Sequence, residues 1–184
     1  MGGMVRTVYY VAASLDGYIA DAENSQKWHG AFSGAEGRDA DFREFFTRVG
    51  ALVMGAATYR TFQSAGPDSW EYGRIPTWVF THHEFPGIAG ADITFVRGDV
   101  AEFHPDIVAD ADGRDIWVVG GGNLAGQFMD QGLVDEMVLT VIPVALGGGR
   151  PLMPVTAATE PAALVESHAL GQGLMQLHYD FGRH

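Results

Sequence analysis

Cysteine is absent from this 184-residue sequence, so disulfide bridges and metal sites built from thiolates are excluded. No stretch reaches the roughly 18 consecutive apolar residues that a membrane-spanning helix requires. The first ten residues, MGGMVRTVYY, also lack the basic region and apolar core of a secretory signal peptide. We therefore expect a cytoplasmic protein with no membrane partner.

Positive charge is also scarce in the chain. Lys and Arg number 11 against 23 Asp and Glu, which gives a formal net charge of −12. Such a surface repels nucleic acids and anionic membranes, so we expect neither as the main partner. The length and the 47% share of hydrophobic residues predict a single domain, residues 1–184, with a sizeable core. A small molecule, held in a local pocket, is the partner that we expect.

The rest of the chain is organised around Ile116–Leu124, which reads IWVVGGGNL. Four apolar residues predict a buried strand, three glycines predict a turn, and Asn123 is a candidate cap for a helix over about 124–131. Such a junction can bind an anion, because the first helical amides have no partners within the helix. An ordinary tight turn in an α/β domain fits the same pattern.

A second strand–glycine–helix junction lies earlier in the chain. Ala51–Met54 is predicted to be a buried strand that ends at Gly55, and a helix is expected over about 56–63. Predicted strands end in polar or glycine turns at 14–17, at Gly55, at 81–82 and at 120–122. Ligands of open α/β sheets bind at the carboxyl ends of strands. These turns therefore predict one long cleft suited to an extended dinucleotide.

The remaining segments complete a mixed sheet. We expect strands over 5–13, 77–80, 93–96 and 136–146, turns over 14–20 and 147–154, and an antiparallel hairpin of 163–170 and 174–181. Residues 101–113 are expected to form a helix or an irregular crossover that Pro105 interrupts. Residues 21–35, anchored by Trp28, are either a mobile loop beside a site or an ordinary surface loop. Parallel strands linked by helices are thus followed by antiparallel strands.

Two acids lie in a predicted helix over 36–49. Its apolar stripe consists of Phe42, Phe45, Phe46 and Val49. Asp39 and Asp41 flank this stripe on opposite sides, and Asp39 is the closer of the two. A carboxyl group at the edge of a core can act as a proton donor or relay. A solvated Asp in the first helical turn, favoured by the helix dipole, is the alternative interpretation.

Other catalytic patterns are missing. The sequence contains no GxSxG elbow, no GxxxxGK[ST] phosphate loop and no HExxH pair. His82 and His83 are adjacent, so on an extended chain they would point to opposite faces and could not readily chelate one metal ion. We expect no metal site.

Four segments carry a resemblance to a known family. They are VYYVAASLDGYIA at 8–20, VMGAATY at 53–59, VFTH at 79–82, and the run from IWVVGGGNL to GGGRPLMP at 116–154. In this order, over nearly the whole chain, they resemble the dihydrofolate reductase superfamily. The chain looks most similar to the reductase domain of the bifunctional riboflavin-biosynthesis deaminase-reductase and its stand-alone relatives. The resemblance implies an α/β, three-layer fold with a central, mostly parallel eight-stranded sheet and antiparallel C-terminal strands.

The resemblance also implies a binding site for NADPH. Ala12 and Ile19 would line the nicotinamide end, and Thr81 and His82 would contact the adenosine ribose and its 2′-phosphate. The residues expected to hold the pyrophosphate are Gly55, Ala56, Ala57, Thr58, Gly120, Gly121, Gly122, Asn123 and Leu124. Either Gly120–Gly121 or Gly121–Gly122 would correspond to the cis glycine pair of the family.

The activity implied by the resemblance is NAD(P)H-dependent hydride transfer to a small heterocyclic or carbonyl substrate, similar to a pterin or a ribosylaminopyrimidinone. Asp39 would be the catalytic acid, with Asp41 as the alternative, Asp16 would contact substrate, and Trp28 would form a wall of the pocket. A homodimer is also implied.

One departure from the family bears on the cofactor. The usual Arg after Met-Gly is replaced by Ala56-Ala57, so NADH is a possible cofactor unless His82 or Arg60 substitutes for that Arg. A non-catalytic module that binds a nucleotide or a small aromatic ligand on the same fold is the alternative function.

Overall fold

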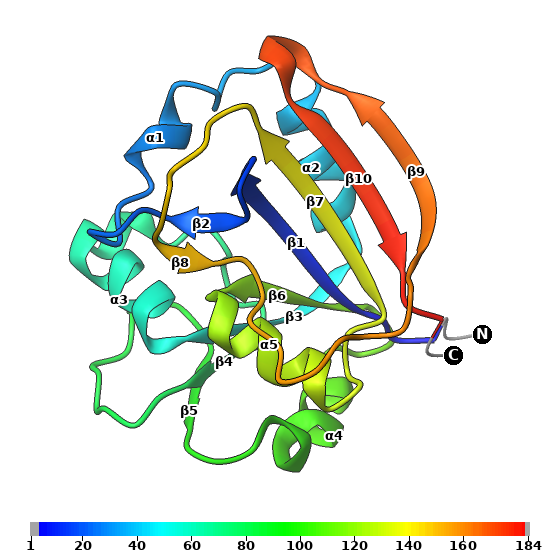
Figure 1. Ribbon diagram of the computed structural model, residues 1–184. Coiled ribbons are helices and arrows are strands. Elements are labelled where there is room, and N and C mark those ends of the chain that lie inside the picture. The colour runs from blue at the N-terminus through cyan, green and yellow to red at the C-terminus, as the bar shows by residue number, and fades with distance from the viewer. Residues whose placement is uncertain (1–3, 183–184) are drawn as a thin grey trace.

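A computed structural model describes residues 4–182 (Figure 1). The strands are β1 Thr7–Ser14, β2 Tyr18–Ala20, β3 Val49–Gly55, β4 Thr77–Phe80, β5 Ile93–Val96, β6 Asp115–Gly120, β7 Glu136–Ile142, β8 Arg150–Pro151, β9 Ala163–Ala169 and β10 Met175–Asp180. The helices are α1 Lys27–Gly30, α2 Arg38–Thr47, α3 Ala56–Ala65, α4 Val100–Asp110 and α5 Gly122–Asp130, with short 3-10 turns at Pro67–Ser69 and Gly171–Gly173.

Eight of the strands form one sheet in the order β5-β4-β3-β6-β1-β7-β10-β9. The strands from β5 to β7 are all parallel, whereas β10 is antiparallel to both β7 and β9. The predicted fold class is thereby confirmed, including the antiparallel C-terminal hairpin. A separate two-stranded pair, β2 and β8, lies beside the carboxyl end of β1 (Figure 1).

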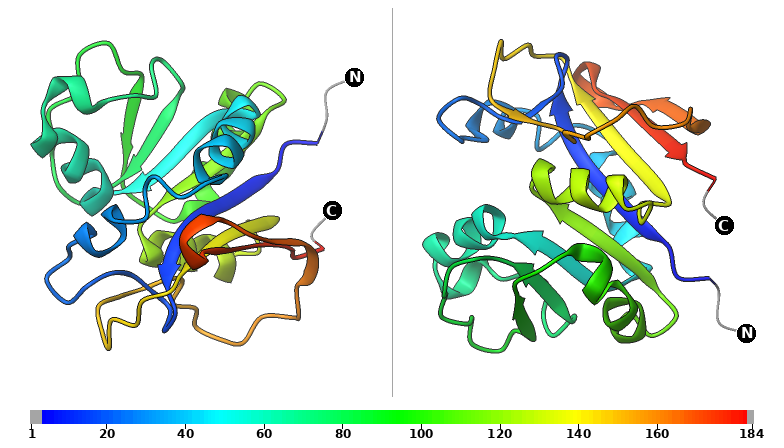
Figure 2. Two further views of the ribbon diagram at one scale, coloured as in Figure 1. Left: turned by 90° about the horizontal axis from the view of Figure 1, so that it is seen from above. Right: turned by 60° about the horizontal axis from the view of Figure 1, so that its bottom comes forward.

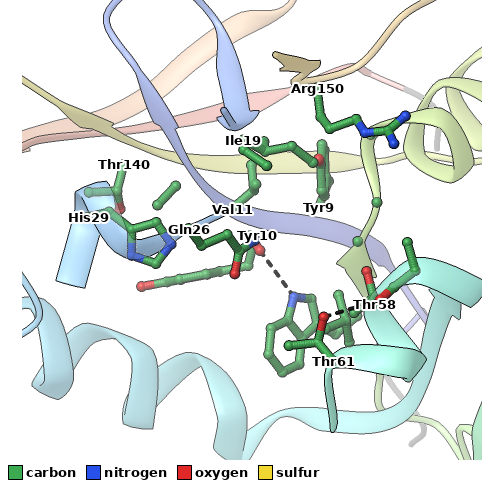
Figure 3. A pocket seen from close by; sticks show the side chains of 18 of the residues that line it. Tyr9, Tyr10, Val11, Ile19, Gln26, His29, Thr58, Thr61, Thr140 and Arg150 are labelled. Atoms are coloured by element: carbon green, nitrogen blue, oxygen red, sulfur yellow. Dashed lines mark hydrogen bonds between the residues drawn. The ribbon is translucent and has the colours of Figure 1, made fainter. Parts of the chain in front are cut away.

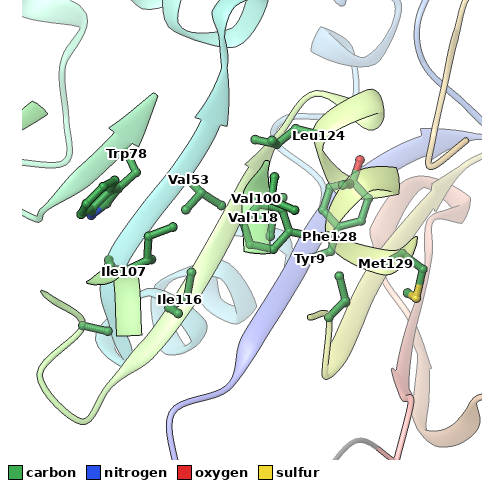
Figure 4. Close-up of a cluster of buried hydrophobic side chains, with 14 of the residues drawn as sticks. Tyr9, Val53, Trp78, Val100, Ile107, Ile116, Val118, Leu124, Phe128 and Met129 are labelled. Atoms are coloured by element: carbon green, nitrogen blue, oxygen red, sulfur yellow. The ribbon is translucent and has the colours of Figure 1, made fainter. Parts of the chain in front are cut away.

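The central strands are apolar on both faces because helices cover both sides of the sheet. In β1, Tyr9 faces the core under α4 and α5, while its neighbour Val8 faces the core under α2. Figure 4 shows the first core, in which Phe128 and Leu124 of α5 pack over Tyr9 and Val118. Figure 2 shows α5 and α2 on opposite sides of the sheet. The result is the three-layer arrangement that the sequence predicts.

The opposite core is built from aromatic rings. Phe45 of α2 is buried and lies 5.8 Å from the ring of Trp117, in an edge-to-face arrangement. Phe42 and Phe46 contact the same indole at 5.3 and 6.2 Å. Edge-to-face pairs add to the stabilisation that burial provides. Three residues of the predicted stripe, Phe42, Phe45 and Phe46, therefore do pack on the sheet and fix the position of α2 beside β1. The helix expected over 36–49 ends at Thr47, and Val49, the fourth residue of the stripe, is instead the first residue of β3.

Two local predictions are wrong. Pro105 does not interrupt a helix, because α4 runs through it from Val100 to Asp110. The carboxylate of Asp99 caps this helix by accepting from the Ala101 amide at 2.8 Å, and the burial of Ile107 anchors it to the core. Asn123 does not cap α5, which begins one residue earlier with Gly121 at the N-cap position. The side-chain oxygen of Asn123, Oδ1, instead accepts a hydrogen bond from Gln127 Nε2 at 2.7 Å.

Three predicted boundaries also change. The strand expected over 136–146 ends at Ile142, directly before Pro143, which cannot donate to a strand ladder. The turn expected over 147–154 contains β8, which pairs with β2. The loop expected over 21–35 contains the one-turn helix α1. Of these three differences, the formation of β8 arises from pairing with a distant segment, which local sequence patterns do not show.

Candidate active site

The two glycine junctions meet at the carboxyl ends of β3 and β6. A Cβ atom placed on Gly55, the N-cap residue of α3, would lie 3.8 Å from the backbone nitrogen of Gly121, the N-cap residue of α5. Neither helix start has a hydrogen bond from a capping side chain. The first amides of both helices therefore lack side-chain partners and converge on one region. The peptide bond between Gly120 and Gly121 is cis, which identifies the pair expected from the resemblance.

A cavity of about 840 Å³ opens on one side of this junction. Its walls come from the ends of β1 and β6, the start of α3, the segment around α1, the first turn of α2 and the β8 segment. Apolar and aromatic side chains dominate the lining, with Arg38, Arg150, Asp39 and Glu71 as its charged residues. Such a volume is in the range of small-molecule sites.

A second cavity of about 300 Å³ lies on the other side of the junction. It is formed by the ends of β4 and β5, the start of α3 and the start of α5. Ala57, Gly121 and Asn123 line both cavities, so the two are adjacent across the glycine turn. Of the four turns predicted to form one cleft, those at Gly55, 81–82 and 120–122 line these cavities, whereas residues 14–17 line neither.

The structure brings the residues expected to bind a dinucleotide to these two cavities. The larger cavity is lined by Ala12, Ile19, Thr58, Gly120 and Gly122. The smaller cavity is lined by Gly55, Ala56, Thr81, His82 and Leu124. Both are lined by Ala57, Gly121 and Asn123. Ala12 and Ile19, expected at a nicotinamide, thus line the larger cavity, and Thr81 and His82, expected at an adenosine, line the smaller one.

The two acids of α2 have different surroundings. Asp39 is exposed and lines the larger cavity. Asp41 lies outside the lining, and its carboxylate pairs with His168 Nε2 of β9 at 2.7 Å. The structure therefore gives Asp39, and not Asp41, access to a ligand in the cavity.

Asp16 and Trp28 are not among the lining residues of either cavity. The Asp16 carboxylate accepts hydrogen bonds from Ser14 Oγ at 2.6 Å and from the backbone amides of Leu146 and Gly147. These bonds, the one from Ser14 above all, lower the pKa of Asp16 to about 2. Through these hydrogen bonds, Asp16 connects the turn after β1 to the segment after β7, which is a structural role.

Trp28 packs into a small core with Ile142, Leu170 and Leu174, and its buried indole N–H has no hydrogen-bond partner among residues 4–182. The next residue, His29, does line the larger cavity, and its ring lies 5.1 Å from the indole. Trp28 therefore anchors α1 beneath the cavity wall and does not form that wall itself.

Several polar residues of the larger cavity escape prediction from the sequence: Tyr10, His29, Arg38 and Thr140. Figure 3 shows three of them, Tyr10, His29 and Thr140. A signal for Tyr10 does exist, because it lies two residues before Ala12 and side chains two apart in a strand share a face. The others come from three different segments, and only the fold brings them together. Burial lowers the pKa of His29 below its ordinary value, and the Arg38 guanidinium adds to this effect.

Two arginines bear on the smaller cavity. Arg97 directly follows β5. It does not line the cavity, but its Nη2 donates at 2.6 Å to the backbone carbonyl of His82, which does. Arg60 does not reach the cavity lining; its guanidinium carbon lies 5.4 Å above the ring of Phe85. Of the two candidates for a missing phosphate contact, His82 is therefore in place and Arg60 is not.

Two searches of residues 4–182 gave negative results. No group of three or more His, Asp or Glu side chains is arranged to hold a metal ion within this range. Over the same residues, no helix has the length and apolar character needed to cross a membrane.

Comparison with known proteins gives consistent matches. The family model described as the RibD C-terminal domain matches residues 69–175. "Uncharacterized protein YwjB" of Bacillus subtilis (strain 168) is 33% identical over 174 residues, covering 95% of this chain and 97% of that protein. "Uncharacterized protein YyaP" of the same organism is 22% identical over 185 residues, covering 95% and 94%.

Solved structures show the same similarity. A "Putative riboflavin biosynthesis protein" from Shewanella sp. PV-4 has a TM-score of 0.82 and 28% identity over 96% of this chain and 98% of that chain. Dihydrofolate reductase from Enterococcus faecalis, complexed with NADP(H), has a TM-score of 0.62 and 16% identity over 95% of each chain. This second similarity concerns the fold alone.

Proposed function

Because this chain belongs to the RibD C-terminal domain family, we propose that it is a reductase that transfers a hydride from NADPH to a small heterocyclic or carbonyl substrate. The observation that carries the proposal is the convergence of two uncapped helix starts where the two cavities adjoin. Unpaired helical amides favour anionic oxygens, so this place suits a pyrophosphate. A dinucleotide would then extend into both cavities.

The residues at the junction fit such a ligand. A Cβ atom on Gly121 would meet no atom within 4 Å, so a ligand can approach this backbone closely. Gly121 and Asn123, at the start of α5, and Ala57 of α3 would hold the pyrophosphate from both sides. A nicotinamide in the larger cavity would supply the hydride. The protein would supply orientation, a proton route and shelter from bulk water.

The rim of the smaller cavity supports NADPH over NADH. His82 lines this cavity, and Arg97, hydrogen-bonded to the His82 carbonyl, is the basic side chain next to it. The 2′-phosphate distinguishes NADPH from NADH. A guanidinium has five donors, and Arg97 uses one of them on the His82 carbonyl. The others remain available to a phosphate. Arg97 would thereby replace the Arg that this chain lacks after Gly55.

Replacing Arg97 by Ser should weaken NADPH binding on the order of 10-fold, the effect of losing one charge-assisted hydrogen bond. NADH binding should change far less, because NADH has no 2′-phosphate. Titration of both dinucleotides against wild type and variant measures the two affinities. Arg60→Ser is the matched control, because the Arg60 guanidinium lies over the ring of Phe85. An equal loss for both dinucleotides would contradict a 2′-phosphate contact.

We further propose that Asp39 relays protons between solvent and the larger cavity, since it is exposed and lines that cavity. Asp39→Asn should lower kcat on the order of 10-fold, less than the loss of a direct general acid. The assay is NADPH oxidation with a panel of pterins, pyrimidinones and carbonyl compounds. Glu44→Gln, at an exposed position of the same helix that does not line the cavity, is the control, and it should keep the wild-type rate. Equal rates for wild type and both variants would contradict the relay.

The same panel separates the reductase from its rival. A protein that binds NADPH and turns over nothing in the panel would be a non-catalytic binding module on this fold. Oxidation of NADPH that depends on one compound of the panel would support the reductase and identify its substrate class.

A further inference from the structure

Tyr10 occupies the end of the larger cavity that the dinucleotide positions leave free. It lies two residues before Ala12 in β1, so both side chains are on one face of the strand, roughly 7 Å apart along it. Two rings of α2 hold the phenol in place. Phe45 stacks on it at 4.7 Å and Phe42 contacts it edge-to-face at 5.5 Å. The ring therefore has little freedom to move.

The hydroxyl of Tyr10 is oriented by a buried amide. Gln176 Nε2, from β10, donates to the Tyr10 oxygen at 3.1 Å and to Thr140 Oγ1 at 3.5 Å. Gln176 is 6% exposed, and it pairs with Thr140 in the register of β10 and β7. Because the Tyr10 oxygen accepts a hydrogen bond, its own hydrogen points elsewhere. Within residues 4–182 the Tyr10 hydroxyl donates no hydrogen bond, so its hydrogen is available to a ligand in the cavity.

Neighbouring hydroxyl groups are placed differently. The Tyr9 hydroxyl, which also belongs to a lining residue, donates to the carbonyl of Leu152 at 2.8 Å and is therefore occupied. Tyr72 lies among Phe46, Phe62 and other rings, and within the described part of the chain no hydrogen bond orients its hydroxyl. Tyr10 is thus the tyrosine of this cavity whose hydroxyl is both held by the protein and free to donate.

The electrostatic surroundings keep this hydroxyl protonated. Burial raises the pKa of Tyr10, an effect that the Asp41 carboxylate increases and that the Gln176 hydrogen bond and the Arg38 guanidinium reduce. Tyr10 is therefore a neutral donor at physiological pH. A donor that is fixed before the ligand arrives stabilises developing negative charge without reorganisation.

We propose that Tyr10 is a catalytic residue whose hydroxyl binds the carbonyl oxygen of a planar substrate and gives that oxygen its proton on reduction. The proposal rests on the reductase function proposed above and narrows its substrate class to compounds with a carbonyl group at the reacting centre. Figure 3 shows Tyr10, His29 and Thr140 at one end of the cavity, where such a ring would lie beside Ala12.

The step balances as a carbonyl reduction. The carbonyl carbon accepts a hydride from the reduced nicotinamide dinucleotide, and the electron pair of the C=O π bond moves to oxygen. The O–H bond of Tyr10 breaks as its proton passes to that oxygen. The substrate becomes an alcohol, the dinucleotide is oxidised, and the tyrosinate regains a proton from water, with Asp39 as the proposed relay. An alkoxide is a stronger base than a tyrosinate, so the transfer is favourable.

The first test measures binding without cofactor. Lumazine, a fluorescent planar dicarbonyl heterocycle, is titrated with wild type, Tyr10→Phe and Tyr179→Phe. Tyr179 lies in β10 and does not line the cavity, so it is the matched control. Loss of one neutral hydrogen bond should weaken binding about 3- to 10-fold in Tyr10→Phe and leave the control unchanged. Equal affinities for wild type and Tyr10→Phe, or no lumazine binding by wild type, would overturn the proposal.

The second test measures turnover of phenanthrenequinone, a planar dicarbonyl compound, with NADPH. Tyr10→Phe should lower kcat on the order of 100-fold or more while KM changes only a few-fold, as expected for a lost general acid. Retention of kcat within about threefold would overturn the proposal. So would a wild-type protein that binds NADPH and does not reduce the quinone.

The two levels of inference can fail separately. If wild type binds no NADPH, the proposed reductase function fails. If NADPH binding and turnover persist in Tyr10→Phe, only the assignment of Tyr10 fails. Thermal unfolding of Tyr10→Phe, which retains the buried ring between Phe42 and Phe45, verifies that the variant is folded.

Discussion

Gly122→Ala is expected to lower the free energy of unfolding by about 3 kcal/mol, the upper end of the cost of overpacking a core. A Cβ atom at this position would overlap the carbonyl oxygen of Pro151 and lie 2.8 Å from that of Leu152. Both obstacles are backbone atoms, so the methyl group can be accommodated only by moving α5 or the β8 segment. Either movement would also disturb the junction between the two cavities.

Chemical denaturation of wild type and variant measures this loss. Gly148→Ala is the control, since a Cβ atom there would meet nothing within 4 Å and its φ is not positive. The control should unfold at nearly the wild-type denaturant concentration. A Gly122→Ala protein with wild-type stability would show that the close approach of α5 to residues 151–152 is not as described.

Gly121→Ala is expected to leave the fold intact and to weaken NADPH binding on the order of 10- to 100-fold. The space around its Cβ position is open, and Gly121 lines both cavities, so the methyl group would occupy space that the proposed pyrophosphate needs. The backbone φ of −81° is accessible to alanine. The estimate corresponds to one or two lost hydrogen bonds to a charged group.

Fluorescence titration gives the affinity, and thermal unfolding gives the stability of the same sample. Gly87→Ala, in an open position where neither the residue nor its chain neighbours line a cavity, is the control and should bind NADPH as wild type does. A Gly121→Ala protein that binds NADPH with wild-type affinity would contradict a dinucleotide that crosses this turn. An unfolded variant would contradict the open space at Gly121.

The sequence predicts the sheet and the cleft well because both depend on local patterns. Apolar runs such as Ile116–Val119 indicate a strand that is buried on both faces, and the glycine turns indicate where a strand ends and a helix begins. The elements that differ depend on contacts between distant segments. Burial of Ile107 and the Asp99 cap keep α4 continuous through Pro105, and the pairing of β2 with β8 orders what reads as a turn.

The same distinction applies to the candidate site. Residues of the family motifs, such as Ala12 and Gly120, reach the cavities because the motifs themselves are strand ends. The hydroxyl of Tyr10 is oriented by Gln176, which lies 166 positions after Tyr10 in the chain. The register of β10 on β7 brings Gln176 to this place. The contact of Asp41 with His168 also depends on the hairpin, so sequence alone leaves the choice between the two acids of α2 open.

The most direct measurement is a parallel titration of the wild-type protein with NADPH and NADH, followed by tryptophan fluorescence. Trp117 lines the larger cavity, so a nicotinamide ring bound there should change its emission. We predict micromolar binding of NADPH and weaker binding of NADH, with Arg97→Ser reducing the difference. If neither dinucleotide binds even near millimolar concentration, the cleft is not a dinucleotide site and the reductase function is contradicted.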